Sequence, residues 1–391
     1  MKLSIYFKKF FQSSQSSGIL LIFCVALALI IANSSLGNDF QKFLDFQLGF
    51  EDLHLKYPVS IWINDGLMAI FFLLVGLEIK RELLEGELSS FKNASLPIFA
   101  AIGGMLIPAI IYSAFNSGTD YSNGWGIPMA TDIAFSLAII SMLGKKVPAS
   151  LKIFLAALAI VDDLGAILVI AIFYTEQIHW SYLLLSFGIV ALLFILNYLK
   201  VKKLIFYLIP GLFLWYFLHH SGIHATIAGV LLAFTIPTNE STTIISPLEK
   251  LEHSLHFPVS FLIMPIFALT NTNIAFNSNM IDGLFSSLGL GIIGGLVLGK
   301  LIGINLFSWI AIKLKISSLP QNSSWNQMIG VGLLAGIGFT MSIFIALLSF
   351  KNEIHFQDEA KFAILIASVI AAVSGYLVLN LSSKRIIEEE D

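Results

Sequence analysis

Charged side chains are scarce in this sequence. Aspartate, glutamate, lysine and arginine together make up 12% of the 391 residues, whereas about 25% is usual in soluble domains. Hydrophobic residues make up 57%, and the mean hydropathy is +0.86. This composition excludes an ordinary soluble domain and predicts a polytopic membrane protein. The formal net charge of −3 provides no basic face for nucleic acid.

Cysteine is almost missing as well. Cys24 is the single cysteine, so an internal disulfide and a thiolate metal centre are both excluded. The histidines show no His-Glu-x-x-His or similar metal-binding spacing. We therefore expect no cofactor.

Twelve apolar runs divide the chain, and we expect each to be a transmembrane helix, because backbone groups inside a bilayer must bond internally. The fold class is an all-α polytopic membrane protein with a single domain over residues 1–391, an outer loop at 35–60 and a charged tail at 382–391. The expected spans are 18–34, 61–79, 96–115, 128–143, 151–174, 182–199, 204–219, 224–236, 257–274, 284–312, 325–350 and 359–381.

The placement of lysine and arginine supports this count. With the N-terminus inside, only Lys42, Lys56, Lys351 and Lys361 fall on outer segments, and Lys300 lies within a span. All the rest of the 22 basic residues fall on inner segments, as the positive-inside rule expects. Both termini are therefore predicted to be cytoplasmic.

Two adjacent carboxylates, Asp162 and Asp163, lie in the middle of the fifth run. One aspartate at the centre of a membrane helix costs about 3 kcal/mol, so two in a row are hard to explain by packing. We interpret them as an ion or proton site. The alternative is a buried pair that hydrogen bonds alone satisfy.

The fourth and eleventh runs share an interruption. Asp132 and Thr131 closely follow Pro128 in the short fourth run, and the eleventh is rich in glycine between Gly330 and Gly338, which weakens a helix. The fourth run is the middle member of spans 3–5, and the eleventh is the middle member of spans 10–12. The first of these triplets starts on the inner side of the membrane and the second on the outer side. This parity predicts inverted repeats with broken central helices.

Lys300 lies in the glycine-rich tenth run, where small residues allow close helix packing. A buried ammonium needs an anion or must lose its proton. Its candidate partners within the spans are Asp162, Asp163 and Asp132. The alternative is that Lys300 extends to the membrane interface.

Further ionisable residues lie near the predicted ends of spans. Glu78 and Glu82 are four residues apart at the inner end of the second span, either as an ordinary solvated helix end or as a charge cluster at a cytoplasmic entrance. Glu252 and His253 lie in an inner loop, and His224 opens the eighth run. Histidine titrates near neutral pH, so a pH response is one reading and a plain loop or cap residue is the other.

These groups can perform ion exchange. Na⁺ and Li⁺ are hard ions that prefer oxygen ligands, which carboxylates and the Thr131 hydroxyl provide. The same oxygens hold either protons or a metal ion, and competition at a site that opens alternately to each side suffices for exchange. Lys300 would supply the counter-charge when the site is empty.

Seven stretches resemble one family, the NhaA-type sodium/proton antiporters. They are INDGLMAIFF at 63–72, GLEIKRE at 76–82, ATDIAF at 130–135, AIVDDLG at 159–165, SGIHAT at 221–226, LEH at 251–253 and LAGIGFTMS at 334–342. They extend from the second run to the eleventh, so the resemblance covers essentially the whole chain.

The resemblance implies specific roles. Asp162 and Asp163 would bind the ion and the protons, and Lys300 would pair with Asp162. Thr131 and Asp132 would sit where the broken helices cross, with Asp132 balancing helix-end dipoles. Glu78, Glu82, Glu252, His253 and His224 would form a pH-response region on and near the cytoplasmic side. The loop at 35–60 would form a hairpin that contacts a second copy in a homodimer. Exchange would be electrogenic, and the protein would lie in the inner membrane of a bacterium.

Two other functions are weighed against exchange. An intramembrane aspartyl enzyme using Asp132 with Asp162 or Asp163 would need a Gly-x-Gly-Asp motif, which the sequence lacks. A channel would need a filter-like loop of backbone carbonyls, and none is apparent. We therefore expect a transporter of Na⁺, Li⁺ and H⁺, and no enzyme.

Overall fold

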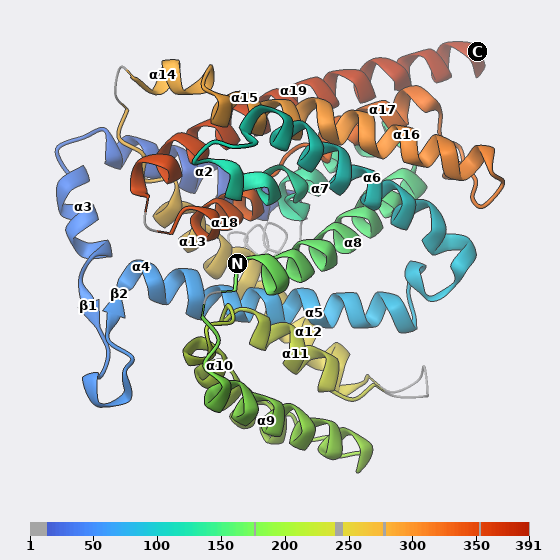
Figure 1. Cartoon of the computed structure of the whole chain (residues 1–391). Helices are drawn as coiled ribbons and strands as arrows, with labels where there is room; N and C mark the ends of the chain where they lie inside the picture. The colour runs from blue at the N-terminus through green and yellow to red at the C-terminus, as the bar shows by residue number, and fades with distance from the viewer. Residues whose placement is uncertain (1–13, 176, 239–244, 277–278, 352, 391) are drawn as a thin grey trace, which may run out of the picture. The chain divides into compact units, whose positions relative to one another are not determined.

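The computed structural model describes residues 14–175, 177–238, 245–276, 279–351 and 353–390. Apart from one two-stranded sheet, the regular elements within these ranges are helices (Figure 1). By its internal contacts the chain forms two compact units. The first unit comprises Met1–Phe23, Glu87–Ala166 and Ile274–Asp391, and the second comprises Cys24–Gly86 and Ile167–Asn273.

The first unit contains most of the long helices. Its elements are η3 (Glu87–Ser89), α6 (Phe91–Asn116), η4 (Ser122–Met129), α7 (Ile133–Met142), η5 (Gly144–Lys146), the larger part of α8 (Ala149–Phe173), α14 (Asn279–Leu284), α15 (Ser287–Ile293), η7 (Gly294–Gly299), α16 (Lys300–Lys313), α17 (Trp325–Leu334), α18 (Phe339–Ser349) and α19 (Ile354–Glu390). Helix α2 (Ser14–Ala32) begins in this unit and ends in the second.

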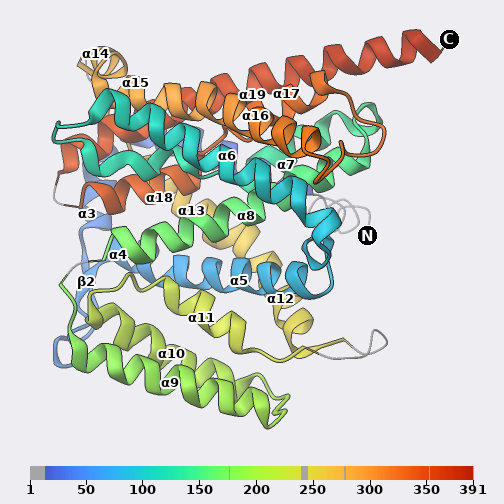
Figure 2. The same ribbon diagram turned by 45° about the vertical axis from the view of Figure 1, so that its right-hand side comes forward.

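Helix pairs in the first unit pack closely, with α16 along α6 and α17 along α19 (Figure 2). Gly103 of α6 and Gly303 of α16 face each other so tightly that a Cβ on either would collide with the carbonyl oxygen of the other. The glycine-rich tenth run therefore allows backbone-to-backbone approach, as small residues do in membrane bundles.

The second unit combines shorter helices with a hairpin. Its elements are the end of α2, α3 (Gly37–Leu44), β1 (Gln47–Leu48), η1 (Glu51–Leu53), β2 (Tyr57–Pro58), α4 (Val59–Ile61), η2 (Trp62–Leu67), α5 (Met68–Leu84), the end of α8, α9 (Trp180–Tyr198), α10 (Ile205–Ser221), α11 (Ile227–Thr235), α12 (Pro247–Pro258), η6 (Val259–Ile263) and α13 (Met264–Asn271). Its core is built from aliphatic residues of α5, α9, α10, α11 and α12, including Leu77, Leu214 and Leu232.

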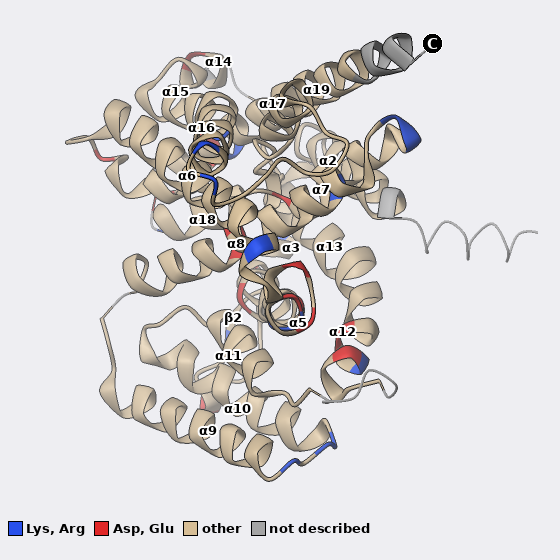
Figure 3. Ribbon diagram, turned by 90° about the vertical axis from the view of Figure 1, so that its right-hand side faces the viewer, with Lys and Arg blue, Asp and Glu red and all other residues tan. Residues whose placement is uncertain are grey.

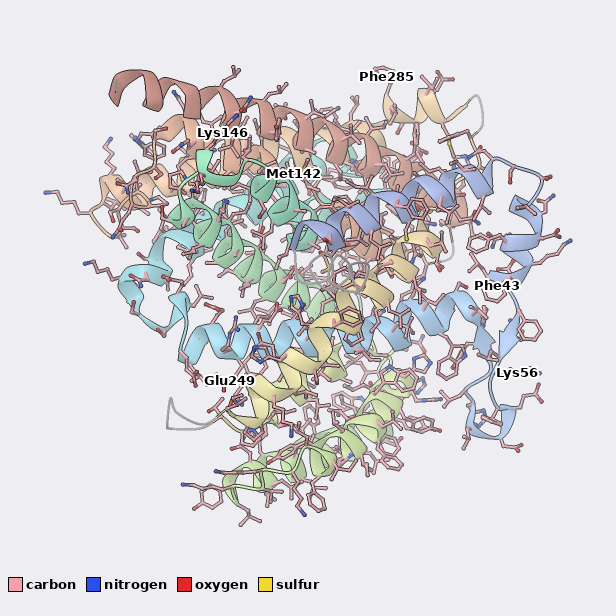
Figure 4. All side chains as sticks on the ribbon, turned by 180° about the vertical axis from the view of Figure 1, so that it is seen from behind. Phe43, Lys56, Met142, Lys146, Glu249 and Phe285 are labelled. Atoms are coloured by element: carbon pink, nitrogen blue, oxygen red, sulfur yellow. The ribbon has the colours of Figure 1, made fainter. Side chains whose placement is uncertain are left out.

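The outer loop expected at 35–60 forms a hairpin. Strand β1 pairs antiparallel with β2, with Gln47 opposite Pro58 and Leu48 opposite Tyr57. Helix α3 precedes it and carries the exposed Phe43, while Lys56 lies just before β2 (Figure 4). The segment 35–60 therefore contains a two-residue ladder between Gln47–Leu48 and Tyr57–Pro58.

Each of the twelve predicted spans coincides with a helix or a run of consecutive helices. Within the described residues, eight helices are long and apolar enough to cross a membrane, or up to ten if each of two bent pairs is one span. The chain is therefore a multi-pass helical membrane protein. Helices α10 and α11 fall short of that length, with 17 and nine residues, so the count of twelve exceeds what length and composition support.

Candidate functional site

The fourth and eleventh predicted spans are both interrupted, as the sequence indicated. The chain passes from the 3₁₀ helix η4 through the extended residues Ala130 and Asp132 before α7 begins at Ile133. In the eleventh span, α17 ends at Leu334 and α18 begins at Phe339, with a 46° bend between them. Each interruption frees backbone groups that need partners in a region without water.

The two interrupted segments provide hydrogen-bond partners for each other's free backbone groups. The Asp132 backbone N–H donates to the Ile337 carbonyl at 2.7 Å. The Ser342 hydroxyl donates to the Ile127 carbonyl at 2.8 Å. These bonds join residues more than 200 positions apart and fix where the two broken helices cross.

Asp132 caps two helices at this crossing. Its Oδ1 accepts from the Phe135 backbone N–H at 3.0 Å, the N-cap bond of α7. Its Oδ2 accepts from the backbone N–H of Thr340 at 3.1 Å and from the Thr340 hydroxyl, in the first turn of α18. A carboxylate at two helix N-termini offsets two positive dipole ends. The carboxylate is 2% exposed, so these bonds replace its hydration.

Asp162 and Lys300 form a buried ion pair. The Lys300 Nζ lies 2.5 Å from Asp162 Oδ2, and neither side chain has any exposed surface. Of the three candidate partners, Asp162 is the one whose carboxylate contacts Lys300. The interpretation that Lys300 extends to the membrane interface is therefore wrong, because removing it from the aspartate would leave two buried charges uncompensated.

Thr131 joins the pair to the broken eleventh span. Its Oγ1 lies 2.8 Å from Asp162 Oδ2 and 2.8 Å from the carbonyl of Ala335, just past the end of α17. A hydroxyl has one proton, so it donates to one of these oxygens at a time. Thr131 and Asp132 are adjacent, and they link the ion pair to the helix crossing.

Asp163 follows Asp162 on α8 and is 1% exposed. Successive helical residues point about 100° apart, so the two carboxylates face different directions. Asp162 Oδ1 accepts no hydrogen bond from the part of the chain that the structure describes. The Asp162 carboxylate, the Thr131 hydroxyl and the Ala335 carbonyl make an all-oxygen donor set, which suits a hard monovalent cation better than a transition metal. Among the described residues, no group of three His, Cys, Asp or Glu residues is placed to hold a metal.

A second charge cluster lies in the second unit, between α5 and α12 (Figure 3). The Arg81 guanidinium contacts Glu252 Oε1 at 2.8 Å and Glu82 Oε1 at 3.0 Å. Glu78 lies one helical turn before Glu82 on α5. Helix α12 starts with a capping box in which Ser246 and Glu249 bond reciprocally, and this fixes where Glu252 projects. His253 is exposed, and its Nδ1 contacts the Glu249 carbonyl at 2.7 Å.

His224 is not part of this cluster. Its Nδ1 contacts the Thr226 hydroxyl at 2.8 Å, and its Nε2 lies 3.7 Å from Asp65 Oδ1. Asp65 is at the start of the α4–η2–α5 helical run, and Glu78 is near its end, about 20 Å further along a helix. The expectation of one region containing both is corrected, because the chain reverses between α10 and α11 and puts His224 at the opposite end of α5.

Sequence reasoning missed several partners. Thr340 and the Ala335 and Ile337 carbonyls were hidden in a glycine-rich run whose break was expected but whose contacts were not. Arg81 was visible between Glu78 and Glu82, yet only the fold brings Glu252 to it. An unexplained arginine within an acidic helix end is the signal that would have found it.

The fold and this site define a polytopic membrane protein with an oxygen-lined, ionisable centre between broken helices. Residues 8–379 match the family model described as Na+/H+ antiporter 1. The chain is 61% identical over 381 residues to Na(+)/H(+) antiporter NhaA 2 of Flavobacterium johnsoniae, covering 97% of this chain and 93% of the relative.

Two further relatives agree. The chain is 52% identical to Na(+)/H(+) antiporter NhaA of Flavobacterium psychrophilum, covering 100% of this chain and 99% of the relative. It is 50% identical to the antiporter NhaA of Dechloromonas aromatica, covering 97% and 96%. The chain belongs to the Na+/H+ antiporter 1 family, which consists of transporters and not enzymes.

Proposed function

We propose that this protein exchanges cytoplasmic Na⁺, or Li⁺, for external H⁺ by alternating access. The observation that carries the proposal is the fully buried Asp162–Lys300 pair, with Thr131 on the same carboxylate oxygen and Asp163 next along α8. A buried cation against a carboxylate at an oxygen-lined site is an arrangement in which an arriving metal ion and a bound proton compete.

In the ion-free state, the Lys300 ammonium neutralises Asp162. An arriving Na⁺ displaces the ammonium, and Lys300 and a protonated Asp163 each release one proton to the cytoplasm, while the carboxylates of Asp162 and Asp163 and the Thr131 oxygen hold the ion. When the site opens to the other side, Na⁺ leaves, and one proton returns to Asp163 and one to Lys300, which pairs with Asp162 again. Asp132 keeps the helix crossing neutral throughout. Electrogenic exchange requires more than one proton to enter for each Na⁺ that leaves.

The membrane topology that we propose has twelve spans and both termini in the cytoplasm of a bacterium, with the protein in the inner membrane. Spans 3–5 and 10–12 form inverted repeats, supported by the matched breaks before α7 and between α17 and α18. The short helices α10 and α11 cross as the seventh and eighth spans. The basic residues Lys2, Lys8 and Lys9, and the side chains of Lys384 and Arg385, lie outside the described residues.

Assembly and regulation belong to the same proposal. The whole chain, 1–391, acts as one antiporter domain, with a charged tail at 382–391 whose side chains beyond Ser382 lie outside the described residues. The hairpin within 35–60 contacts a second copy in a homodimer. Glu78, Glu82, Glu252 and His253 adjust exchange to cytoplasmic pH, supported by the Arg81 bridge between two of these carboxylates. His224 contributes to the pH response from the other end of α5.

Proton flux in inside-out vesicles tests the exchange. Vesicles come from a strain without its own sodium exporters, respiration builds a pH gradient, and a fluorescent amine reports it while Na⁺, Li⁺ or K⁺ is added at several pH values. We expect Na⁺ and Li⁺, but not K⁺, to collapse the gradient. Asp163→Asn should abolish the response, and Asp39→Asn, at an exposed carboxylate on α3, should not. Normal exchange by Asp163→Asn would overturn the mechanism.

A further inference from the structure

Helix α6 contains a backbone acceptor that lacks its usual helical donor. Pro108 lies inside α6, and proline has no N–H, so it cannot make the bond that residue 108 of a helix gives to the carbonyl of Gly104. Gly104 and Pro108 are both buried. Inside a membrane, a carbonyl freed in this way is satisfied by groups of neighbouring helices, since lipid offers no donor.

This carbonyl lies on the face of α6 that contacts η7 and α16 (Figure 2). A Cβ built on Gly299, the last residue of η7, would lie 3.0 Å from the Pro108 nitrogen and 2.8 Å from the Pro108 Cα. In an α-helix the carbonyl of residue i lies beneath the nitrogen of residue i+4, on the same side of the helix. Because the Pro108 nitrogen faces Gly299, the Gly104 carbonyl faces the same neighbour.

The Lys300 side chain lies against this part of α6. A Cβ built on Gly104 would lie 3.6 Å from the Lys300 Cδ and 2.9 Å from the Ile304 Cγ1. Of these two side chains, only the lysine carries N–H donors. Its Cδ is two bonds from Nζ, so rotation about the last side-chain bonds moves the amino group while the stem keeps its place.

The lysine has donors to spare for a second acceptor. An ammonium has three N–H groups, and Asp162 Oδ2 accepts one of them in this structure. Gly104, Pro108, Asp162 and Lys300 all belong to the first unit. Two acceptors for one amino group, a carboxylate oxygen on α8 and a backbone carbonyl on α6, therefore lie in the same compact unit.

We propose that the Gly104 carbonyl receives the amino group of Lys300 while Na⁺ occupies the site, which makes Gly104 and Pro108 positioning residues for exchange. In the ion-free state the ammonium stays on Asp162. When Na⁺ displaces it, Nζ moves to the Gly104 carbonyl. An amino group donates N–H whether it is charged or neutral, so the proton that Lys300 releases does not break this contact.

The contact lowers the Na⁺ concentration at which the lysine is displaced. Without it, Na⁺ binding would leave both the amino group and the Gly104 carbonyl unpaired in a region without water, and each unpaired group opposes binding. One hydrogen bond between them removes both penalties. This inference rests on the proposed function, because it adds a residue to the same exchange.

Two replacements of Pro108 that differ in a single N–H group test the proposal. Pro108→Ala supplies an N–H that binds the Gly104 carbonyl within α6. Lactic acid, the α-hydroxy analogue of alanine, supplies the same methyl group at this position but no N–H, and nonsense suppression introduces it. The full-length variants are compared in proteoliposomes, where a fluorescent dye follows the pH gradient while Na⁺ is titrated. The titration gives the KM for Na⁺ and the maximal rate.

The two replacements should differ in KM. Pro108→Ala should raise the KM for Na⁺ about fivefold, which corresponds to ~1 kcal/mol, and should keep the maximal rate. The lactic acid variant should keep the wild-type KM, because its Gly104 carbonyl still lacks a helical donor. A purely structural role of the proline ring would change both variants alike. Pro97→Ala, about three turns earlier in α6, is the matched control and should leave the KM unchanged.

Equal KM values in Pro108→Ala and in the lactic acid variant would overturn the proposal. If Pro108→Ala does not fold, replacement of Met105 with its α-hydroxy analogue turns the Gly104 carbonyl into an ester, which is a weaker acceptor. This replacement should also raise the KM, and an unchanged value would overturn the proposal. The proposed function fails separately, when the wild type shows no Na⁺-driven proton flux at any pH.

Discussion

The two units of this protein hold their charges in different ways. In the first unit, Asp132, Asp162 and Lys300 are almost fully buried and are neutralised by helix ends and by one another. In the second unit, Arg81 is 36% exposed, and its partner Glu82 is 17% exposed.

The difference bears on which charges we propose to carry transport and which we propose only to adjust it. Removing one member of a dry pair leaves a charge that water does not reach, and this costs several kcal/mol. Removing Arg81, which is 36% exposed, leaves Glu82 and Glu252 at 17% and 8% exposure, where water still screens part of the charge, and this costs less. We therefore expect the ion pair in the first unit to be coupled strongly to ion binding, and the Arg81 cluster weakly.

The largest effect is expected from neutralising the buried carboxylate. Asp162→Asn should abolish sodium-driven collapse of the pH gradient at every pH, because an amide supplies no charge for the ion. Glu82→Gln in the second unit should keep the maximal rate and change only its pH dependence. Equal losses in the two variants would remove the distinction between the units.

Next in size is the loss of the lysine. Lys300→Ala should destabilise the protein by about 3–5 kcal/mol, measured by thermal unfolding in detergent, because Asp162 stays buried without its cation. The double variant Asp162→Asn/Lys300→Met should recover most of the lost stability. If Lys300→Ala unfolds at the wild-type temperature, the pair does not carry the stability assigned to it.

Loss of a cap shared by two helices should lower the stability of the protein more than loss of a cap on one helix. Asp132→Ala removes the acceptor for α7 and α18 and should cost about twice the ~1 kcal/mol of a single N-cap. Ser246→Ala, which removes the cap of α12 alone, is the matched control. Asp132→Asn should fall between them, since an amide oxygen still accepts hydrogen bonds. Equal destabilisation by Asp132→Ala and Ser246→Ala would argue against the shared cap.

A smaller effect is expected at the Arg81 cluster. Arg81→Gln should cost about 1 kcal/mol, because the guanidinium is 36% exposed and its ion pairs are partly screened, while Glu252, whose side chain is 8% exposed, loses its partner. Thermal unfolding in high salt should reduce this difference further, whereas the Lys300 effect should persist. A salt-independent loss at Arg81 would place this cluster with the buried charges.

The smallest effect concerns the solvent-exposed pair of Glu51 and Lys56 on the hairpin. The hydrogen bond and the charge of Lys56 lower the pKa of Glu51 below its ordinary value of 4.5. A lowered carboxyl pKa contributes stability that is present above the ordinary value and is lost as pH falls through the folded-state value. Lys56→Met should therefore leave the hydrogen exchange of the hairpin unchanged between about pH 5.5 and about pH 8. A change in that window would show that the Glu51–Lys56 pair contributes to the hairpin's stability above the range expected from the lowered pKa of Glu51.

Much of the fold could be predicted because a transmembrane helix is specified by the hydrophobicity of one contiguous segment. Each expected span coincides with a helix or with consecutive helices, and the breaks near Asp132 and between Gly330 and Gly338 follow from proline and glycine. The separation of His224 from Glu78 could not be predicted in the same way. It depends on which ends of α5, α10 and α11 meet, and this is a tertiary property.

The sequence by itself determined the class of protein, the buried carboxylates Asp162, Asp163 and Asp132, and the need of Lys300 for an anion. These follow from hydropathy and from the cost of a charge in an apolar run, which are properties of short segments. Only the tertiary structure decided that Lys300 pairs with Asp162, that Asp132 caps α18 as well as α7, and that His224 lies beside Asp65. The Lys300–Asp162 pairing joins residues 138 positions apart, and the Asp132–Thr340 pairing joins residues 208 positions apart. Packing selects such pairings because each buried polar group must find a partner.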